Sequence, residues 1–470
     1  MDQKREQMKR IYMDKKKKLK ISVVMPCLNM VHYIKECLDS VVNQTLVEIE
    51  IIIIDAGSID GTQNIIKEYA SRDSRVKILL SDMRSYGYQV NLGVEAAIGE
   101  YIAIVDTDDR IVLDTYEVLY TVAEETKADY VKGTAEMFYT FYNGLCYRRS
   151  LSQFMETQYG QKGRIELCPK NMPSLIMKDN FLWYGIYRAD FLKRVKLNQT
   201  YGAAFQDFGG LLQTQLYAEK AVYISKKVYE YRQDNVNSSN YNKKGFHFIA
   251  EEYQWAQRFI EDQTEGWKGA FYHKFFLHFM DRMYAMAASG IFWEDTFSDM
   301  EKIAERLRWA YTEKLLTKEQ LNSEEWNDMC MLWSSPYDLY IKYREMYIEN
   351  KKALQYIYKN IKGKIGIIFG AGRLGTFIHA QFLSRSEKNI AAYCDNKAEL
   401  VGKQQYGIDI LSPKQAIKIF SQAIFIIALK YGVETIKEQL LELGVDEKNI
   451  LVSRINIDFH LFGEVLEEVC

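Results

Sequence analysis

The chain contains few of the residues that cross-link or stiffen extracellular proteins. Its 470 residues include five prolines and seven cysteines, and no two cysteines form a Cys-x-x-Cys pair. An odd, unpatterned set of cysteines argues against a disulfide framework and against a structural zinc site. The six histidines do not form a metal-binding spacing either. We therefore expect reduced thiols and a cytoplasmic protein.

Long apolar runs and a strong excess of one charge are also missing. No apolar run approaches the roughly 18 residues that a membrane-spanning helix needs, and the N-terminus does not resemble a secretory signal. The net charge is −2, so nothing global favours nucleic acid as a partner. The basic segment 1–20 is the local exception. We expect a solvated leader there, and the alternative is peripheral contact with anionic lipid at the inner face of the membrane.

What is present is a pattern typical of a multidomain α/β protein. From Ile21 onward, short β-branched runs alternate with segments of helical spacing. The run EIEIIIID is typical of a strand buried on both faces of a parallel sheet. This alternation predicts βαβ units and a doubly wound α/β domain over residues 21–245.

The second half of the chain shows two further patterns. Residues 246–360 carry aromatic and charged side chains at helical spacing, with Pro336 as their only proline, and this predicts a helical connector. Strand and helix patterns resume with IGIIFGAGRLG. We expect a small Rossmann-like domain over residues 361–470.

Acidic residues follow one of the predicted strands. Ligands of open α/β sheets bind beyond the carboxyl ends of the strands. Asp106 and Asp108 lie directly after YIAIV, where two carboxylates at i and i+2 can converge on Mn²⁺ or Mg²⁺. Such a cation keeps open positions for diphosphate oxygens. The alternative is a solvated acidic turn in which Asp109 caps the next helix.

Several segments together resemble the family 2 glycosyltransferases of GT-A fold, over roughly residues 21–240. Their order and spacing make the match specific. The segments are SVVMPCLN, SVVNQT, EIEIIIIDAGSIDGT, SYGYQVNLGVEAAIGEYIAIVDTDD, FLWYGIYRADFL, FQD and YEYRQDNVNSS.

The resemblance implies which residues bind the donor. Asp106 and Asp108 match the family's Asp-x-Asp pair, with Asp108 as the more direct metal ligand. Pro26 and Asp55 belong to loops that cradle the base and ribose, and Arg232 is placed near the donor phosphates. The full nucleotide-binding set is Pro26, Asn29, Asp55, Ser58, Asp106 and Arg232.

The chain departs from the family pattern at two places. Ala56 stands where the family usually has a second Asp, which leaves the base open, although a UDP-sugar is the expected donor. Val90 stands where the family often has an arginine, and Arg84 is a candidate substitute.

The resemblance also implies the acceptor side of the reaction. Asp207, in the FQD segment, matches the general base that an acceptor hydroxyl needs, because such a hydroxyl has a pKa far above 7. The alternative role of Asp207 is helix capping. One displacement without an enzyme-bound sugar inverts the anomeric centre. Trp183 and Tyr184 either stack on an acceptor sugar or pack beneath the site.

A second glycine-rich motif lies near the C-terminus. Gly370, Gly372 and Gly375 form a GxGxxG arrangement after a predicted strand, with Asp395 twenty positions after the last glycine. This context predicts a site for a nucleotide, a nucleotide-sugar or NAD. The segment resembles the small nucleotide-binding domains beside sugar-modifying enzymes of glycan assembly. The alternative is that the glycines only permit tight packing.

These patterns predict an inverting, metal-dependent glycosyltransferase. Its acceptor is expected to be a saccharide or lipid-linked saccharide in cell-surface polysaccharide assembly. Two other classes stay open: an NAD-dependent sugar-nucleotide oxidoreductase or epimerase acting through the C-terminal domain, and a non-catalytic scaffold. Tyr393 and Lys397 have YxxxK spacing, but they straddle an acidic loop and do not lie on a catalytic helix, which argues against the oxidoreductase.

Overall fold

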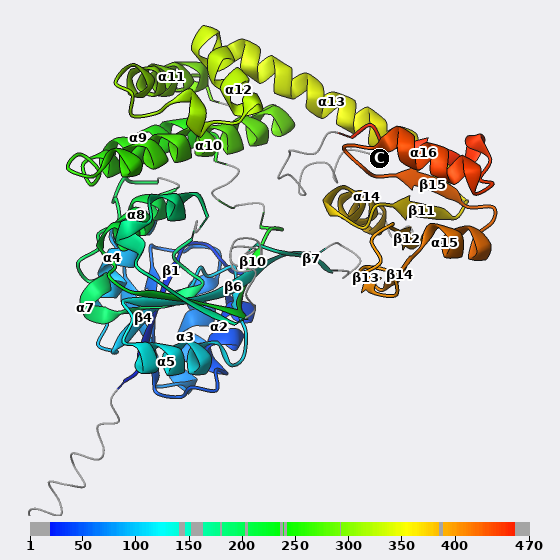
Figure 1. Ribbon diagram of the computed structural model, residues 1–470. Helices are drawn as coiled ribbons and strands as arrows, with labels where there is room; N and C mark the ends of the chain where they lie inside the picture. Colours follow the sequence, from blue (N-terminus) through cyan, green and yellow to red (C-terminus); the bar gives the residue numbers. More distant parts are fainter. Residues whose placement is uncertain are drawn as a thin grey trace, which may run out of the picture. The chain divides into compact units, whose positions relative to one another are not determined.

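The computed structural model describes most of the chain as two compact units (Figure 1). Unit 1 comprises Met1–Met137, Arg149–Phe279 and Ser298–Trp326, and unit 2 comprises Phe138–Arg148, Met280–Phe297 and Asn327–Cys470. The basic leader lies outside the described residues, except for its last two. The described residues are 19–140, 146–151, 163–178, 181–202, 205–235, 238, 242–291, 293–384 and 389–455.

A large mixed sheet is the framework of unit 1. Its main path runs β3-β2-β1-β4-β9-β6-β10-β5, with β7 paired to β6 and β8 paired to β10. The first four strands of this path are parallel, and β9 joins β4 in the antiparallel sense. The strands are β1 (Ile21–Cys27), β2 (Ile49–Asp55), β3 (Val76–Leu80), β4 (Tyr101–Ile104), β5 (Arg110–Ile111), β6 (Tyr130–Thr140), β7 (Cys146–Ser150), β8 (Arg164–Leu167), β9 (Gly185–Arg188) and β10 (Ala221–Arg232).

Helices cover both faces of this sheet, as the apolar strands require (Figure 1). Successive residues of a strand point to opposite faces. Val23 packs in one buried cluster with Leu38, whereas Val24 packs in another with Val90. The first cluster contains α2 (Ile34–Val42), α3 (Thr62–Arg72) and α5 (Thr115–Thr126), and the second contains α4 (Tyr86–Ala96), α7 (Ala189–Leu192) and α8 (Asp207–Tyr217).

The segment expected to be a helical connector is helical. Ser335 begins the last of its helices, since its Oγ accepts a 3.1 Å hydrogen bond from the Asp338 amide and Pro336 occupies the first turn. The division into units passes through this segment rather than around it. Its helices are α9 (Gly245–Gln257), α10 (Glu265–Ser289), α11 (Thr296–Thr312), α12 (Ser323–Ser334) and α13 (Pro336–Ile361).

Unit 2 contains a second, mostly parallel sheet. Its strand order is β13-β14-β12-β11-β15-β16. The strand that comes first along the chain, β11, therefore lies in the middle of the sheet. Among the pairings described for this sheet, only β13–β14 is antiparallel. The elements are β11 (Gly366–Phe369), α14 (Arg373–Ser384), β12 (Ile390–Cys394), β13 (Gln404–Gln405), β14 (Ile408–Leu411), α15 (Pro413–Ile419), β15 (Ile424–Ile427), α16 (Val433–Glu442) and β16 (Ile450–Val452).

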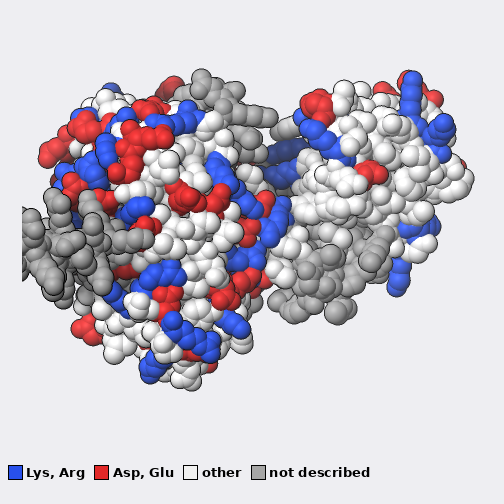
Figure 2. Space-filling view, turned by 90° about the horizontal axis from the view of Figure 1, so that it is seen from below, with Lys and Arg blue, Asp and Glu red and all other residues white. Residues whose placement is uncertain are grey.

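The surface agrees with the modest net charge. On the face drawn in Figure 2, acidic and basic side chains are interspersed. Among the described residues, no helix combines the length and apolar character that crossing a bilayer demands.

Candidate active site

Two strand-end loops of unit 1 are joined by hydrogen bonds at the carboxyl edge of the parallel strands. The Asn29 amide, after β1, donates a 2.8 Å hydrogen bond to Ser58 Oγ, after β2. Asn29 Oδ1 in turn accepts a 3.0 Å hydrogen bond from the Ile59 amide. Asn29 has φ 55°, a left-handed conformation that Asn tolerates better than most residues. The sequence-predicted residues Asn29 and Ser58 therefore lie together.

Asp55 and Pro26 extend this network inward. Asp55 is 1% exposed and accepts hydrogen bonds from the Ser58 amide at 3.2 Å and from Gln63 Nε2 at 2.7 Å. The Pro26 carbonyl accepts a 3.0 Å hydrogen bond from Thr107 Oγ1. The loop after β1 is thereby linked to the acidic loop after β4. All of these predicted residues belong to one edge of the sheet.

The two carboxylates of the Asp-x-Asp pair are each positioned by a separate element. Asp106 Oδ1 accepts a 3.0 Å hydrogen bond from the Tyr86 hydroxyl, at the start of α4. Asp108 Oδ2 accepts a 2.7 Å hydrogen bond from Asn235 Nδ2, in the loop after β10. The orientation of each carboxylate therefore depends on residues distant in the chain.

Asp109 has a structural role that differs from the alternative considered for it. It is completely buried and accepts hydrogen bonds from the Tyr229 hydroxyl at 2.8 Å and from the Arg232 amide at 2.7 Å. The N-cap position of the next helix, α5, is held by Asp114. Asp109 thus anchors the acidic loop to β10, and its role as a helix cap is wrong.

The acidic loop concentrates negative charge in a desolvated place. Burial, followed by the charges of Asp108 and Asp207, raises the pKa of Asp106 to about 8. Burial also raises the pKa of Asp108. Crowded carboxylates are stabilised by a cation, and hard oxygen ligands suit Mg²⁺ or Mn²⁺. The residues present therefore fit a divalent metal.

The protein does not supply a complete metal cage. Among the described residues, no group of three or more His, Cys, Asp or Glu side chains is arranged to hold a metal ion. Mg²⁺ commonly takes one or two carboxylates and completes its shell with water and substrate phosphates. The Asp106–Asp108 pair fits that partial arrangement.

Asp207 lies at the first residue of α8. Burial raises the pKa of Asp207 to about 6, while the amides of Asp207 and Phe208 and the charge of Lys274 oppose the rise. Phe205, just before the helix, has φ 64°, an uncommon conformation for a bulky residue. A carboxylate at a helix N-terminus is favoured by the helix dipole. Capping and base chemistry are therefore compatible at this position.

Arg232 is held mainly by protein groups. It is 7% exposed, and its Nε donates a 2.7 Å hydrogen bond to the Asp108 carbonyl. Its guanidinium pairs with Glu36 and with Asp234, and lies 5.0 Å from the centre of the Tyr33 ring. These contacts make Arg232 a support of the acidic loop. Arg84, the candidate substitute cation, is exposed.

Trp183 and Tyr184 pack beneath the site. Trp183 is 4% exposed and stacks on Phe181 at 4.6 Å and on Tyr229 at 4.2 Å between ring centres. The Lys132 ammonium lies 4.9 Å from the centre of the Tyr184 ring. Of the two roles considered for this pair, these contacts favour packing.

Sequence reasoning missed several residues of the site. Tyr86 and Tyr229 lie inside the segments SYGYQ and YEYRQ, but the sequence pattern assigns no role to either tyrosine. Glu252, in α9, accepts a 2.7 Å hydrogen bond from the Gly209 amide, two residues after Asp207. Nothing in the local pattern of α9 signals this role, because the contact spans 43 residues.

In unit 2 the glycine-rich loop is hydrogen-bonded to Asp395. Asp395 accepts hydrogen bonds of 2.9 Å from the Ala371 amide and from the Lys397 amide. A Cβ on Gly375 would lie 1.9 Å from the Gly370 carbonyl oxygen, whereas one on Gly372 would meet nothing within 4 Å. Tight packing therefore explains Gly375 but not Gly372.

The YxxxK spacing does not form a catalytic pair in the structure. Tyr393 lies on β12, and its buried hydroxyl is 2.8 Å from His379 Nδ1. Burial lowers the pKa of His379 to about 4, so this imidazole is neutral near pH 7. Tyr393 is thus part of a packed core.

The sheet of unit 1 carries joined loops and clustered carboxylates at its carboxyl edge, and the comparisons with known proteins identify it as part of a glycosyltransferase. Residues 22–172 match the family model described as Glycosyl transferase family 2. GlyG of Streptococcus pneumoniae serotype 4 is 31% identical over 220 residues, which cover 45% of this chain and 70% of GlyG. The chain therefore belongs to the family 2 glycosyltransferases.

Other comparisons define how far the likeness extends. GlyA of the same organism is 29% identical over 218 residues, and the match spans only 30% of its length. The crystal structure of S. aureus TarS 1–349 in complex with UDP gives a TM-score of 0.52 at 18% identity, covering 70% of this chain and 91% of that one. The expected GT-A fold is thereby confirmed for the N-terminal part. A second model, described as C2185-like, N-terminal, matches residues 361–451.

Proposed function

We propose that this glycosyltransferase transfers a sugar from a UDP-sugar to a saccharide acceptor, with a divalent metal and with inversion. One observation carries the proposal. Asp106, Asp108 and Asp207 bring carboxylates to one desolvated region, where Asp108 and Asp207 raise the pKa of Asp106. Such an arrangement suits a metal-assisted displacement with a separate base.

The donor is proposed from the loops and from a structural neighbour. TarS 1–349 has been solved with UDP and with UDP-GlcNAc. The corresponding cradle in this chain is the pair of joined loops at Asn29 and Ser58, with Asp55 beneath them. We propose that these loops bind the uridine and ribose.

Asp106 and Asp108 would hold the metal, which is Mn²⁺ or Mg²⁺. When bound, a divalent cation neutralises the charge that develops on the leaving diphosphate. Tyr86 and Asn235 orient the two carboxylates, and Arg232 fixes the loop that carries them. No general acid is then required of the protein.

Asp207 would take the proton of the acceptor hydroxyl. Its pKa of about 6 leaves the carboxylate deprotonated at pH 7 while keeping it a better base than an exposed Asp. A single displacement by that hydroxyl gives the inverted product. By family resemblance, we propose an acceptor in cell-surface polysaccharide assembly.

The cellular setting is also a proposal. The cysteines in the described parts are all free, which suits a reducing, cytoplasmic compartment. The basic leader is proposed to be solvated, with peripheral contact to membrane lipid as the alternative. The glycine loop of unit 2 is proposed to bind a nucleotide, a nucleotide-sugar or NAD.

Nucleotide release from a panel of UDP- and GDP-sugars tests the proposal. Each donor is assayed with Mn²⁺ or Mg²⁺ and with EDTA, in wild type, Asp108→Ala, Asp207→Asn and the control Glu68→Gln. Glu68 is an exposed acid of α3, paired only with its neighbour Arg72 among the salt bridges described. We expect release from one UDP-sugar that needs metal, falls at least 100-fold in both site variants and survives in the control. Metal-independent release, or full activity of Asp207→Asn, would contradict the mechanism. The anomeric configuration of the product tests inversion.

A further inference from the structure

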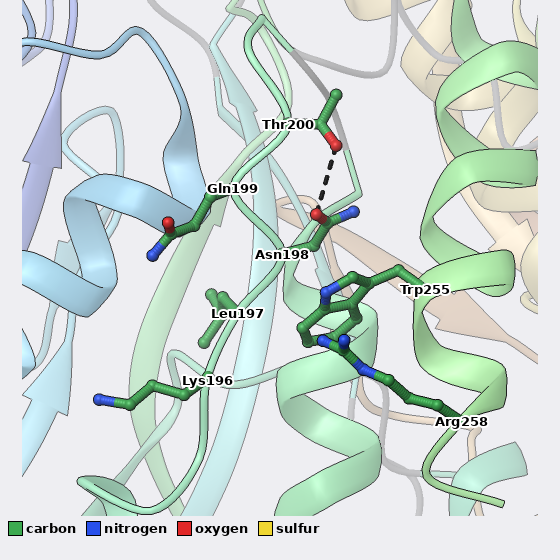
Figure 3. Close-up of a pocket in the computed structure, with 7 residues that line it drawn as sticks. All are labelled: Lys196, Leu197, Asn198, Gln199, Thr200, Trp255 and Arg258. Carbon is green, nitrogen blue, oxygen red and sulfur yellow. Dashed lines mark hydrogen bonds between the residues drawn. The ribbon is translucent and has the colours of Figure 1, made fainter.

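A pocket of about 470 Å³ in unit 1 lies beside the helix that begins with the proposed base (Figure 3). This volume is in the range of roughly 300–1,000 Å³ typical of small-molecule sites. One wall is the segment that precedes α8, and the other is the end of α9. The lining residues are Lys196, Leu197, Asn198, Gln199, Thr200, Trp255 and Arg258.

The charged residues of the lining are both basic. Arg258 is exposed and its guanidinium lies 4.4 Å from the centre of the Trp255 ring. Figure 3 shows these two side chains together on one wall, whereas Lys196 lies on the opposite segment and its side chain points away from them. A guanidinium stacked on an aromatic ring still has N–H groups at its edge, in the geometry that binds a phosphate or carboxylate with two hydrogen bonds.

The acids near the pocket do not cancel this charge. Lys196 pairs with Glu95 at 3.7 Å, but the two side chains are 52% and 72% exposed, so the pair is weak. Glu252 lies behind the wall and accepts a 3.0 Å hydrogen bond from Asn198 Nδ2. Burial raises the pKa of Glu252 to about 8, which favours its neutral form at pH 7.

The pocket wall is bonded directly to the elements that carry the site. The Thr200 carbonyl accepts a 3.0 Å hydrogen bond from Gln206, the residue before Asp207. Gln206 Oε1 accepts hydrogen bonds from Ser85 Oγ at 3.0 Å and from the Gly87 amide at 2.9 Å, on either side of Tyr86. A ligand in the pocket would therefore lie next to the groups that position the base and Asp106.

We propose that this pocket is an acceptor subsite for a saccharide that carries a phosphate or carboxylate group. Arg258 binds the anion, and Trp255 holds the guanidinium flat and contributes apolar surface to the sugar ring. The inference rests on the proposed transferase function, because it assigns the ligand as part of the acceptor.

Calorimetric titration of the full chain, saturated with UDP and Mn²⁺ to block the donor site, tests the subsite. The probes are glucose 6-phosphate, glucose and inorganic phosphate. We expect glucose 6-phosphate to bind at least tenfold more tightly than either of the other two. Arg258→Gln should weaken its binding at least tenfold.

Arg306→Gln is the matched control, because Arg306 stacks on Trp309 at 3.9 Å from its ring centre but does not line the pocket. This variant should bind glucose 6-phosphate as wild type does. Three results would overturn the proposal. Wild type and Arg258→Gln bind glucose 6-phosphate equally well, or wild type does not bind it, or wild type binds it no more tightly than inorganic phosphate. Hydrolysis of the UDP-sugar should stay within twofold of wild type in Arg306→Gln. If the wild-type protein does not hydrolyse the UDP-sugar, the transferase proposal is contradicted. Failure of the transferase proposal is therefore distinguishable from failure of the subsite proposal.

Discussion

The hydroxyl of Tyr86 donates a 3.0 Å hydrogen bond to Oδ1 of Asp106, joining the first residue of α4 to the acidic loop after β4. Burial and nearby carboxylates, Asp106 first among them, raise the pKa of Tyr86 well above its usual value. The phenol thus stays protonated and remains a donor. A fixed donor holds one oxygen of Asp106, so the orientation of this carboxylate depends on a residue of another element.

Tyr86→Phe should reduce activity while leaving the fold intact. A bound metal would keep Asp106 charged during turnover. A hydrogen bond to a charged group contributes about 1.5–3 kcal/mol, so we expect roughly a tenfold to hundredfold loss in kcat/KM. The Phe ring conserves most of the packing, and the melting temperature should change little. Tyr88→Phe, an exchange on the same helix, is the control. Activity of Tyr86→Phe within twofold of wild type would show that this contact is dispensable.

The pH dependence of turnover should report the ionisation of Asp207. A general base acts only when deprotonated, and the pKa of Asp207 is raised to about 6. The rate should therefore rise from pH 5 to pH 7 with a midpoint near 6 and then level. The residual activity of Asp207→Asn should lack this limb. Stopped assays at constant ionic strength measure the pH profile. If Asp207→Asn shows the same rise in rate between pH 5 and pH 7 as wild type, the rise does not come from Asp207.

Glu252 should make the protein less stable as the pH rises. Its pKa is raised to about 8 in the folded chain, from an ordinary value of 4.5, chiefly by burial. Between these values the folded chain binds a proton that the unfolded chain has released, so stability falls with increasing pH. Glu252→Gln removes the titration, and its melting temperature should fall less between pH 5.5 and 8.5 than that of wild type.

Glu252→Ala provides the structural comparison. It removes the acceptor for the Gly209 amide and for Asn198 Nδ2, which leaves two buried donors without this partner. We expect a loss of about 2–3 kcal/mol in the free energy of unfolding at pH 6, measured by urea denaturation. Equal stability of the Ala and Gln variants at that pH would show that neither hydrogen bond matters.

Substitution of two glycines of unit 2 tests whether each is needed for packing or for ligand binding. Gly375→Ala would place a Cβ 1.9 Å from the Gly370 carbonyl oxygen, so we expect a destabilised unit 2 with a loss of at least about 2 kcal/mol. Gly372→Ala meets no atom within 4 Å and should leave the melting temperature unchanged. Titration with UDP, UDP-GlcNAc and NAD then shows whether Gly372→Ala weakens any ligand. If Gly372→Ala binds these ligands as tightly as wild type does, a close approach of the ligand to the Gly372 backbone is contradicted.

The local features of this protein can be predicted from its amino-acid sequence. Alternating apolar runs and helical segments predicted the parallel strands, and motif order placed Asp106, Asp108 and Asp207 together in one fold. These features are readable because strand burial, helix period and strand-end loops depend on neighbouring residues. The helical character of residues 246–360 followed from the same local periodicity.

The roles of the individual side chains depend on contacts that form in the folded chain. Arg232 meets Glu36 across 196 positions, and Tyr229 meets Asp109 across 120, so no local pattern encodes either pair. The same holds for Trp183, which stacks on Tyr229 of β10. Burial and electrostatic interaction depend on which distant segments pack together, and therefore the fold, not the motif, sets the charge and role of each group.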